Sequence, residues 1–128
     1  MSSTVLDASA LLTVLLGEPG AQRTLEAARE GAALGAINLA EVVARMQQTG
    51  ASESEIRDQI AKFGLEIVPF DEELAYQTGL LLRLTKHRGL SLGDRACLAL
   101  AARLGLPALT ADAAWAGLQV GVRVELVR

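Results

Sequence analysis

Short apolar segments alternate with longer amphipathic ones along the whole chain. The short segments are bounded by glycine, proline or polar residues, and their length and composition are typical of buried strands. They are residues 4–6, 33–37, 65–70, 106–110 and 122–127. The alternation therefore predicts an α/β protein in which a parallel sheet is covered by helices on both faces.

The amphipathic segments predict the helices between these strands. Leu39, Val42, Val43 and Met46 follow the i, i+3, i+4, i+7 spacing of a helix face, and Ser52 begins a capping-box pattern. Glycine and proline mark several of the ends. The expected helices are residues 8–17, 21–30, 38–50, 52–64, 71 to about 86, 94–104 and a short turn at 113–116.

Composition limits the chain to one folded domain over residues 1–128. With 128 residues, 51% of them hydrophobic and 21% charged, the chain can bury a core and is not typical of a disordered protein. Its formal net charge of −3 gives no overall basic signature. A nucleic-acid partner would have to be held by a local basic patch and by metal ions.

Redox and targeting signals are sparse. The single cysteine, Cys97, excludes a disulfide within the chain, and its apolar helical surroundings indicate a buried core residue and not a nucleophile. The first residues lack a basic region, and their apolar run ends at Asp7. No apolar run reaches the ~20 residues of a membrane helix. We expect a cytoplasmic protein with no membrane partner.

Four acidic residues mark the transitions from apolar segments to helix starts. They are Asp7 in TVLDAS, Glu41 in AINLAE, Asp94 in LSLGD and Asp112 in LTAD. In a parallel sheet such junctions lie at the carboxyl edge, where ligands bind. Carboxylates gathered there without a histidine or cysteine cluster favour a hard divalent cation such as Mg²⁺ or Mn²⁺.

Each of these acids also has a structural interpretation as a helix cap. Asp7 and Asp112 precede helices directly, while Glu41 and Asp94 fit capping boxes with Asn38 and Ser91. Asp7 is the hardest to explain as a cap alone, because a carboxylate behind a buried strand costs desolvation energy. The apolar stripe of residues 39–46 faces away from Glu41, so only its place in the first helical turn brings it near the sheet. The location shared by all four favours a common site.

Four sequence segments resemble a PIN domain, and most closely a VapC-type toxin ribonuclease of a type II toxin–antitoxin system. They are VLDASALL, NLAEV, LSLGDRACLALA and LTADAAW, in the order found in that family and spanning nearly the whole chain. The SLGDR and TADxxW pieces are the most specific. The DxS piece alone would be weak.

The resemblance implies a three-layer α/β/α fold with a central, mainly parallel sheet of four to five short strands. It implies a Mg²⁺- or Mn²⁺-dependent endoribonuclease that hydrolyses RNA. It further implies a homodimer and a VapB-type antitoxin partner. The residues that match the family's catalytic metal-binding acids are Asp7, Glu41, Asp94 and Asp112, and those that match its supporting polar residues are Ser9, Asn38 and Thr110.

A basic stretch near Asp94 is a candidate for holding RNA. Arg83, Lys86 and Arg88 precede this acid, and Arg95 follows it. Such a run can bind phosphates or form only a solvated face. The apolar surplus of residues 39–60 also predicts an exposed interface.

Competing functions remain open from sequence. Asp7-Ala8-Ser9 lacks the second acid of the D-x-D motif that haloacid-dehalogenase phosphatases use, and glycine-rich phosphate loops are absent. A PIN nuclease of RNA maturation and a catalytically silent PIN-like binding module are the alternatives to a toxin.

Overall fold

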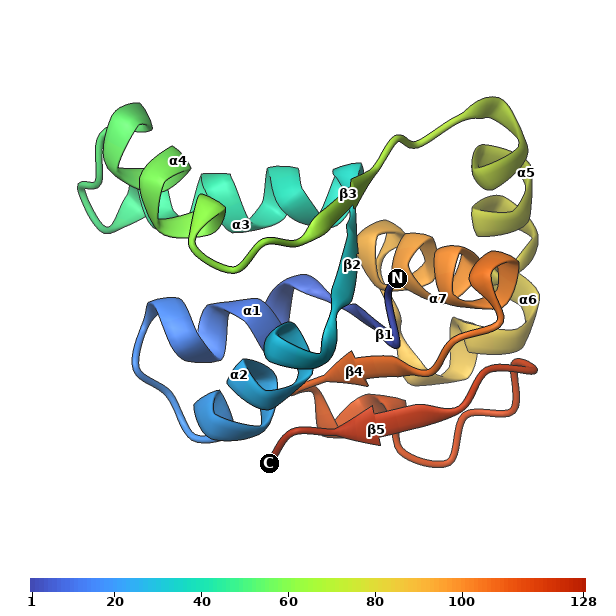
Figure 1. Ribbon diagram of the computed structural model, residues 1–128. Coiled ribbons are helices and arrows are strands. Elements are labelled where there is room, and N and C mark those ends of the chain that lie inside the picture. The colour runs from blue at the N-terminus through green and yellow to red at the C-terminus, as the bar shows by residue number, and fades with distance from the viewer.

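Five short parallel strands form the centre of the molecule, and helices cover both faces of their sheet (Figure 1). The computed structural model describes residues 1–128. The strand order is β3-β2-β1-β4-β5, and every neighbouring pair is parallel. The predicted three-layer α/β/α fold is confirmed. The strands are β1 (Thr4–Leu6), β2 (Ala32–Gly35), β3 (Glu66–Val68), β4 (Ala108–Thr110) and β5 (Val124–Leu126).

The helices divide between the two faces in chain order (Figure 1). Helices α1 to α4 lie on one side of the sheet and α5 to α7 on the other. Their bounds are α1 (Ala8–Leu15), α2 (Ala21–Glu30), α3 (Ala36–Gln48), α4 (Glu53–Ala61), α5 (Glu72–Leu80), α6 (Leu82–Thr85) and α7 (Leu92–Leu104), with 3₁₀ turns η1 (Lys86–Arg88) and η2 (Ala113–Trp115).

Two hydrophobic clusters follow from the two-residue period of the strands. Leu6 of β1 packs with the α1–α4 cluster, whereas its neighbour Val5 packs with the α5–α7 cluster. Leu34 and Ala33 of β2 divide in the same way. Because both faces are buried, these strands appear in the sequence as continuous apolar runs.

The central position of β1 sets the geometry of the carboxyl edge. Leu6 pairs with Leu34 of β2 and with Leu109 of β4, so these strands end at nearly the same level. The segments that follow them, including Asp7, therefore emerge side by side. None of the helices combines the length and apolarity that a bilayer-spanning segment requires.

Two helix predictions were wrong in detail. The helix expected from residue 71 to about 86 is divided into α5, α6 and η1 by a turn at Leu81, although the backbone of Leu81 keeps helical dihedral angles. Helix α3 begins at Ala36, not at Asn38, with Gly35 as a cap that uses no side chain. Asn38 thus lies inside the helix and is free for another contact.

Candidate functional site

Asp7 lies at the end of β1 and receives hydrogen bonds from three directions. Its Oδ1 accepts from the Ala10 amide (2.8 Å) and from Ser9 Oγ (2.8 Å). Its Oδ2 accepts from Thr110 Oγ1 (2.7 Å) on the neighbouring strand β4. The Ala10 bond makes Asp7 the N-cap of α1, so the capping interpretation also holds. Hydrogen bonds from the backbone of α1, from Ser9 and from the neighbouring strand β4 therefore hold the Asp7 carboxylate in one orientation.

The Asp7 carboxyl is poorly compensated electrostatically. Only 3% of the residue is exposed, and this burial is the main cause that raises its pKa from 3.8 to about 6. The hydrogen bonds from Thr110, Ala10 and Ser9 lower the pKa, while the negative charge of Asp94 raises it. No basic side chain forms an ion pair with Asp7. A buried anion of this kind favours a positive ligand.

Glu41 is held by Asn38 against the start of α7. The Asn38 Nδ2 donates to Glu41 Oε1 (2.8 Å) and to the Gly93 carbonyl (3.0 Å). Partial burial is the main cause that raises the pKa of Glu41. The hydrogen bond from Asn38 lowers this pKa, and the negative charge of Asp94 raises it. The expected capping box between Asn38 and Glu41 is wrong, because Asn38 joins two helices instead.

Asp94 stands in the first turn of α7. Its Oδ2 accepts from the Ser91 amide (2.9 Å), and Ser91 Oγ accepts from the Asp94 amide (3.2 Å), which forms the predicted capping box. Beneath it lies Cys97, which is fully buried as expected. Burial raises the pKa of the Cys97 thiol well above its ordinary value, and the charges of Asp7, Asp94 and Glu41 add to this. The charge of Asp94 therefore acts on both Asp7 and Glu41, and all three acids act on the buried Cys97 thiol.

Asp112 follows β4 and is the most exposed of the four acids. Its Oδ1 caps η2 through the Ala114 amide (2.9 Å), while its own amide donates to Thr110 Oγ1 (3.0 Å). The Thr110 hydroxyl thus links the Asp112 backbone to the Asp7 carboxylate. Ser9 joins the same network, because its Oγ accepts from the Ala111 amide (3.0 Å).

The structure gathers the acids at one edge without forming a closed coordination shell. No three acidic, histidine or cysteine side chains lie close enough together to coordinate a single ion. Glu41, Asp94 and Asp112 each use one carboxylate oxygen for a protein donor, and their second oxygens accept no hydrogen bond from the chain. Every donor at this edge is a hard oxygen, which is the ligand type of Mg²⁺ and Mn²⁺.

The four basic candidates have different surroundings. Arg88 Nη1 donates to the carbonyl oxygens of Ala114 and Ala116, so this side chain supports η2. Arg95 is half-buried and donates to the Thr78 carbonyl at 3.0 Å. Arg83 and Lys86 are exposed and make no hydrogen bond or ion pair through their side chains.

Sequence reasoning missed Gly93 and the bracing role of Arg88. Gly93 is buried against Glu41, and the sequence signal for it was a glycine within a helix start, where alanine is normally preferred. The partners of Arg88 lie more than 25 positions away, so no local pattern indicates them.

Comparison with known proteins gives a family and a fold. A family model described as PIN domain matches residues 4–119. No curated protein sequence matches the chain.

Solved structures share the fold over almost the full length. A toxin–antitoxin complex from Klebsiella pneumoniae has a chain that is 24% identical, with a TM-score of 0.75 and 98% of both chains covered. A chain of DNA-bound VapBC from Salmonella typhimurium is 18% identical, with a TM-score of 0.70 and 100% of both chains covered. VapBC2 from Rickettsia felis, bound to a promoter DNA fragment, has a chain that is 16% identical, with a TM-score of 0.70 over 95% of this chain and 96% of that one.

Proposed function

The chain belongs to the PIN domain family, and we propose that it is a divalent-metal-dependent endoribonuclease, the VapC-type toxin of a toxin–antitoxin pair. Membership of this family supports a nuclease. The single observation that carries the proposal is the Asp7 carboxylate, which is buried at the carboxyl edge beside Asp94 with no cation from the chain. Such an arrangement destabilises the fold unless a ligand compensates the charge.

Mg²⁺ or Mn²⁺ fits the donor set at this edge. Asp7, Glu41 and Asp94 are the residues that would hold the ion, and water molecules would supply the remaining ligands because no three of these side chains can reach one ion directly in this structure. Asp112 would act from the far side of the Thr110 network. The unengaged oxygens of Glu41, Asp94 and Asp112 support this assignment. When bound, a divalent ion supplies Lewis-acid chemistry that acidifies water and stabilises negative charge on a phosphate.

The contribution of the chain is to fix the acids and keep them ionised. Ser9 and Thr110 donate hydrogen bonds to Asp7, which oppose the effect of burial on its pKa and orient both oxygens. Asn38 does the same for Glu41. The first turn of α7 adds the positive end of a helix dipole next to Asp94. Phosphodiester hydrolysis at this edge needs no histidine, and the only one, His87, is exposed on η1.

In this proposal, exposed basic side chains of α6 and η1 hold the phosphates of the RNA. Arg83 and Lys86 have free charged groups, whereas Arg88 and Arg95 are engaged with backbone carbonyls. The phosphate-binding role therefore narrows from four residues to two.

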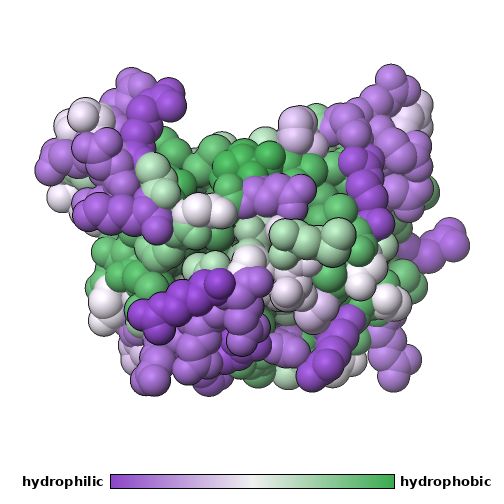
Figure 2. Space-filling view, viewed as in Figure 1, coloured by the Kyte–Doolittle hydropathy of each residue, from purple (hydrophilic) through white to green (hydrophobic).

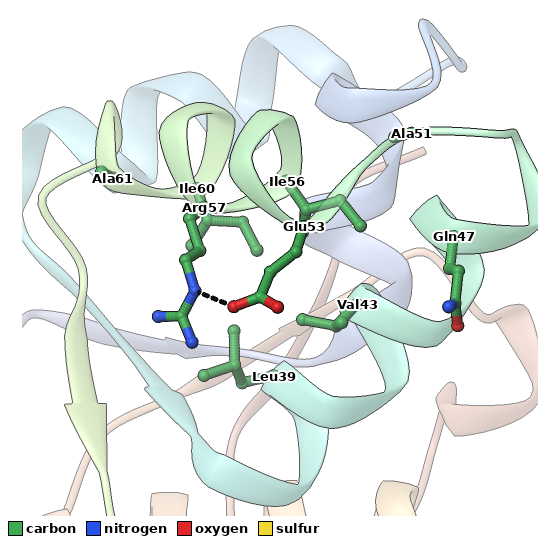
Figure 3. A pocket seen from close by; sticks show the side chains of 9 residues that line it. All are labelled: Leu39, Val43, Gln47, Ala51, Glu53, Ile56, Arg57, Ile60 and Ala61. Carbon is green, nitrogen blue, oxygen red and sulfur yellow. Dashed lines mark hydrogen bonds and ion pairs between the residues drawn. The ribbon is translucent and has the colours of Figure 1, made fainter.

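An apolar groove supports an antitoxin partner. It lies between α3 and α4, has a volume of about 690 Å³ and is lined chiefly by Leu39, Val43, Ile56 and Ile60 (Figure 3). The Glu53–Arg57 ion pair (2.8 Å) crosses its rim. Figure 2 shows hydrophobic surface between the hydrophilic corners formed by α4 and α5. Similar solved structures are toxin–antitoxin complexes, and a VapB-type segment with an apolar helix face would suit this groove.

A second apolar surface supports a homodimer. Tyr76 in the middle of α5 and Leu80 at its end are exposed by 62% and 68%, and Leu82 and Leu84 of α6 by about half. Exposed apolar side chains on two consecutive helices are typical of a protein interface. We assign it to a second copy of the chain.

Cleavage of labelled total RNA tests the proposed function. Wild-type protein is compared with Asp7→Asn in Mn²⁺, in Mg²⁺ and in EDTA, and the exposed Asp58→Asn on α4 is the matched control. We expect cutting that needs the metal, is lost in Asp7→Asn and is kept in Asp58→Asn. Identical RNA after wild type and Asp7→Asn would overturn the nuclease assignment and favour a binding module.

A further inference from the structure

Gly93 occupies a position where a helix would ordinarily carry a side chain. It lies in the first turn of α7, immediately before Asp94, and it is buried. Its backbone is in the normal helical region, so no left-handed turn requires glycine there. Glycine within a helix is less favourable than alanine because it loses more backbone entropy on folding. Its presence therefore requires a local reason.

The reason is the carboxylate of Glu41. A Cβ at Gly93 would overlap both oxygens and the carboxyl carbon of Glu41, and these are the three atoms nearest to it. The other internal helical glycine, Gly79 of α5, has no atom within 4 Å of the equivalent point. The conflict at Gly93 is thus specific to one side chain, which comes from α3.

Asn38 keeps Glu41 in this position. Its Nδ2 donates both to Glu41 Oε1 and to the carbonyl of Gly93 itself. Asn38 is 1% exposed, so neither bond is readily replaced by water. Glu41 can avoid a new Cβ only by rotating its flexible end away, and this rotation breaks the Asn38–Glu41 bond. Such a movement leaves the core of the fold intact.

We propose that Gly93 is a positioning residue of the active site, whose missing side chain lets the Glu41 carboxylate lie against α7 beside Asp94. The inference rests on the proposed function, because it concerns the geometry of the proposed metal ligands. It predicts that a single methyl group at residue 93 displaces one ligand without unfolding the chain.

Mn²⁺ binding measured by calorimetry on purified Gly93→Ala tests this proposal. We expect the Kd for Mn²⁺ to weaken by about tenfold or more, the size typical of losing a group that orients a ligand. Circular dichroism should show unchanged helix content. Gly79→Ala is the matched control, because it adds the same methyl group in open space, and it should bind Mn²⁺ like the wild type.

A double-mutant comparison shows whether the effect passes through Glu41. In Glu41→Ala the obstructing carboxylate is gone, so adding Gly93→Ala should change the residual Mn²⁺ affinity by less than about twofold. Two results would overturn the inference about Gly93 without contradicting the metal site. One is wild-type Mn²⁺ affinity in Gly93→Ala, and the other is an equal loss of affinity when Gly93→Ala is added to the wild type and to Glu41→Ala. If Gly93→Ala fails to fold, recovery of the fold in the double variant supports the conflict with Glu41, and failure of the double variant to fold overturns it. A wild-type chain that binds no Mn²⁺ would overturn the proposed function and this inference with it.

Discussion

The Thr110 hydroxyl donates a 2.7 Å hydrogen bond to Asp7 Oδ2, although the two residues are 103 positions apart in the chain. The bond exists because β1 and β4 are neighbours in the sheet, with Leu6 paired to Leu109 one residue before each partner. The same hydroxyl accepts from the Asp112 amide at 3.0 Å. One side chain thus fixes the buried acid and the loop that carries the fourth acid.

Thr110→Val should weaken RNA cleavage and move its pH dependence. The bond from Thr110 lowers the pKa of Asp7, so its removal raises a pKa that burial already places at about 6. We expect the acidic limb of the pH–rate profile to move to higher pH at fixed Mn²⁺, and cleavage to fall by about tenfold, as is typical when an orienting partner is lost. The profile is measured by quantifying cut RNA over time.

Thr24→Val is the matched control for Thr110→Val. Thr24 is equally buried, and its hydroxyl donates to the Ala10 carbonyl at 3.0 Å on the α1–α2 side of the fold. Its loss should lower stability by about 1–2 kcal/mol, within the range for a buried hydrogen bond, without moving the pH profile. An equal shift in both variants, or no shift in Thr110→Val, would contradict the role assigned to Thr110.

The pattern of the sequence was sufficient for the fold and for the PIN family. Residues 4–6 were predicted as a strand and form β1 with the same bounds, because a short apolar run ended by an acid leaves little alternative. The grouping of acids at the carboxyl edge follows from the parallel sheet, which the alternation of strands and helices predicted. Their role as metal ligands stays a prediction.

Interactions between distant residues were not predictable from local pattern. Asn38 fits the pattern of a cap, but α3 begins two residues earlier, after Gly35, and the freed amide group reaches α7. Arg88 belongs to a basic run that indicates phosphate binding, yet its guanidinium supports η2. In both cases the side chain donates a hydrogen bond to a backbone carbonyl that lies nearby only in the folded chain, so the local sequence does not predict it.

Asp7→Asn should stabilise the chain at neutral pH when divalent ions are chelated. The folded-state pKa of Asp7 is raised from 3.8 to about 6, so its contribution to stability is full below 3.8 and is lost as the pH rises through about 6. A shift of this size corresponds to roughly 3 kcal/mol for a buried group. Urea unfolding in EDTA should therefore show a growing advantage of Asp7→Asn across that pH window.

The difference between the two proteins isolates Asp7 from other titrating groups. The exposed Asp71, whose pKa the Arg103 guanidinium lowers to about 2, contributes in the opposite direction at lower pH, and it is present in both proteins. Parallel stability curves for wild type and Asp7→Asn would mean that burial does not destabilise the Asp7 carboxylate. Addition of Mn²⁺ should reverse the order of stability, because only the wild type gains a bound ion.

Arg83→Ala with Lys86→Ala should weaken RNA binding in a salt-dependent way. Both side chains are exposed and free of protein partners, so each can neutralise one phosphate. We expect the slope of log K against log salt to become shallower by roughly 0.7 for each phosphate of a single strand that is no longer neutralised. Filter binding of the inactive Asp7→Asn background, with and without the two changes, measures this slope.

Arg88→Ala should behave differently from the Arg83 and Lys86 pair. Its guanidinium holds the carbonyls of Ala114 and Ala116, so its loss should loosen η2 and lower cleavage while the salt slope stays unchanged. Hydrogen exchange at residues 113–116 reports the loosening. If the salt slope of RNA binding became shallower in Arg88→Ala and stayed constant in the Arg83→Ala, Lys86→Ala variant, then Arg88, and not Arg83 and Lys86, would be the residue that binds phosphate.

Val43→Glu should block binding of an antitoxin and leave the nuclease active. Val43 lines the groove between α3 and α4 and is already 37% exposed, so a carboxylate there disturbs the fold little (Figure 3). A partner that buries an apolar helix face over it would have to bury the new charge as well, at a cost of about 2 kcal/mol, or roughly 30-fold in Kd.

The measurement is titration of each variant with a purified VapB-type antitoxin. Ala44→Glu, one residue along α3 and exposed outside the groove, should keep wild-type affinity. Equal binding by wild type and Val43→Glu, or equal loss in both variants, would place the antitoxin on another surface.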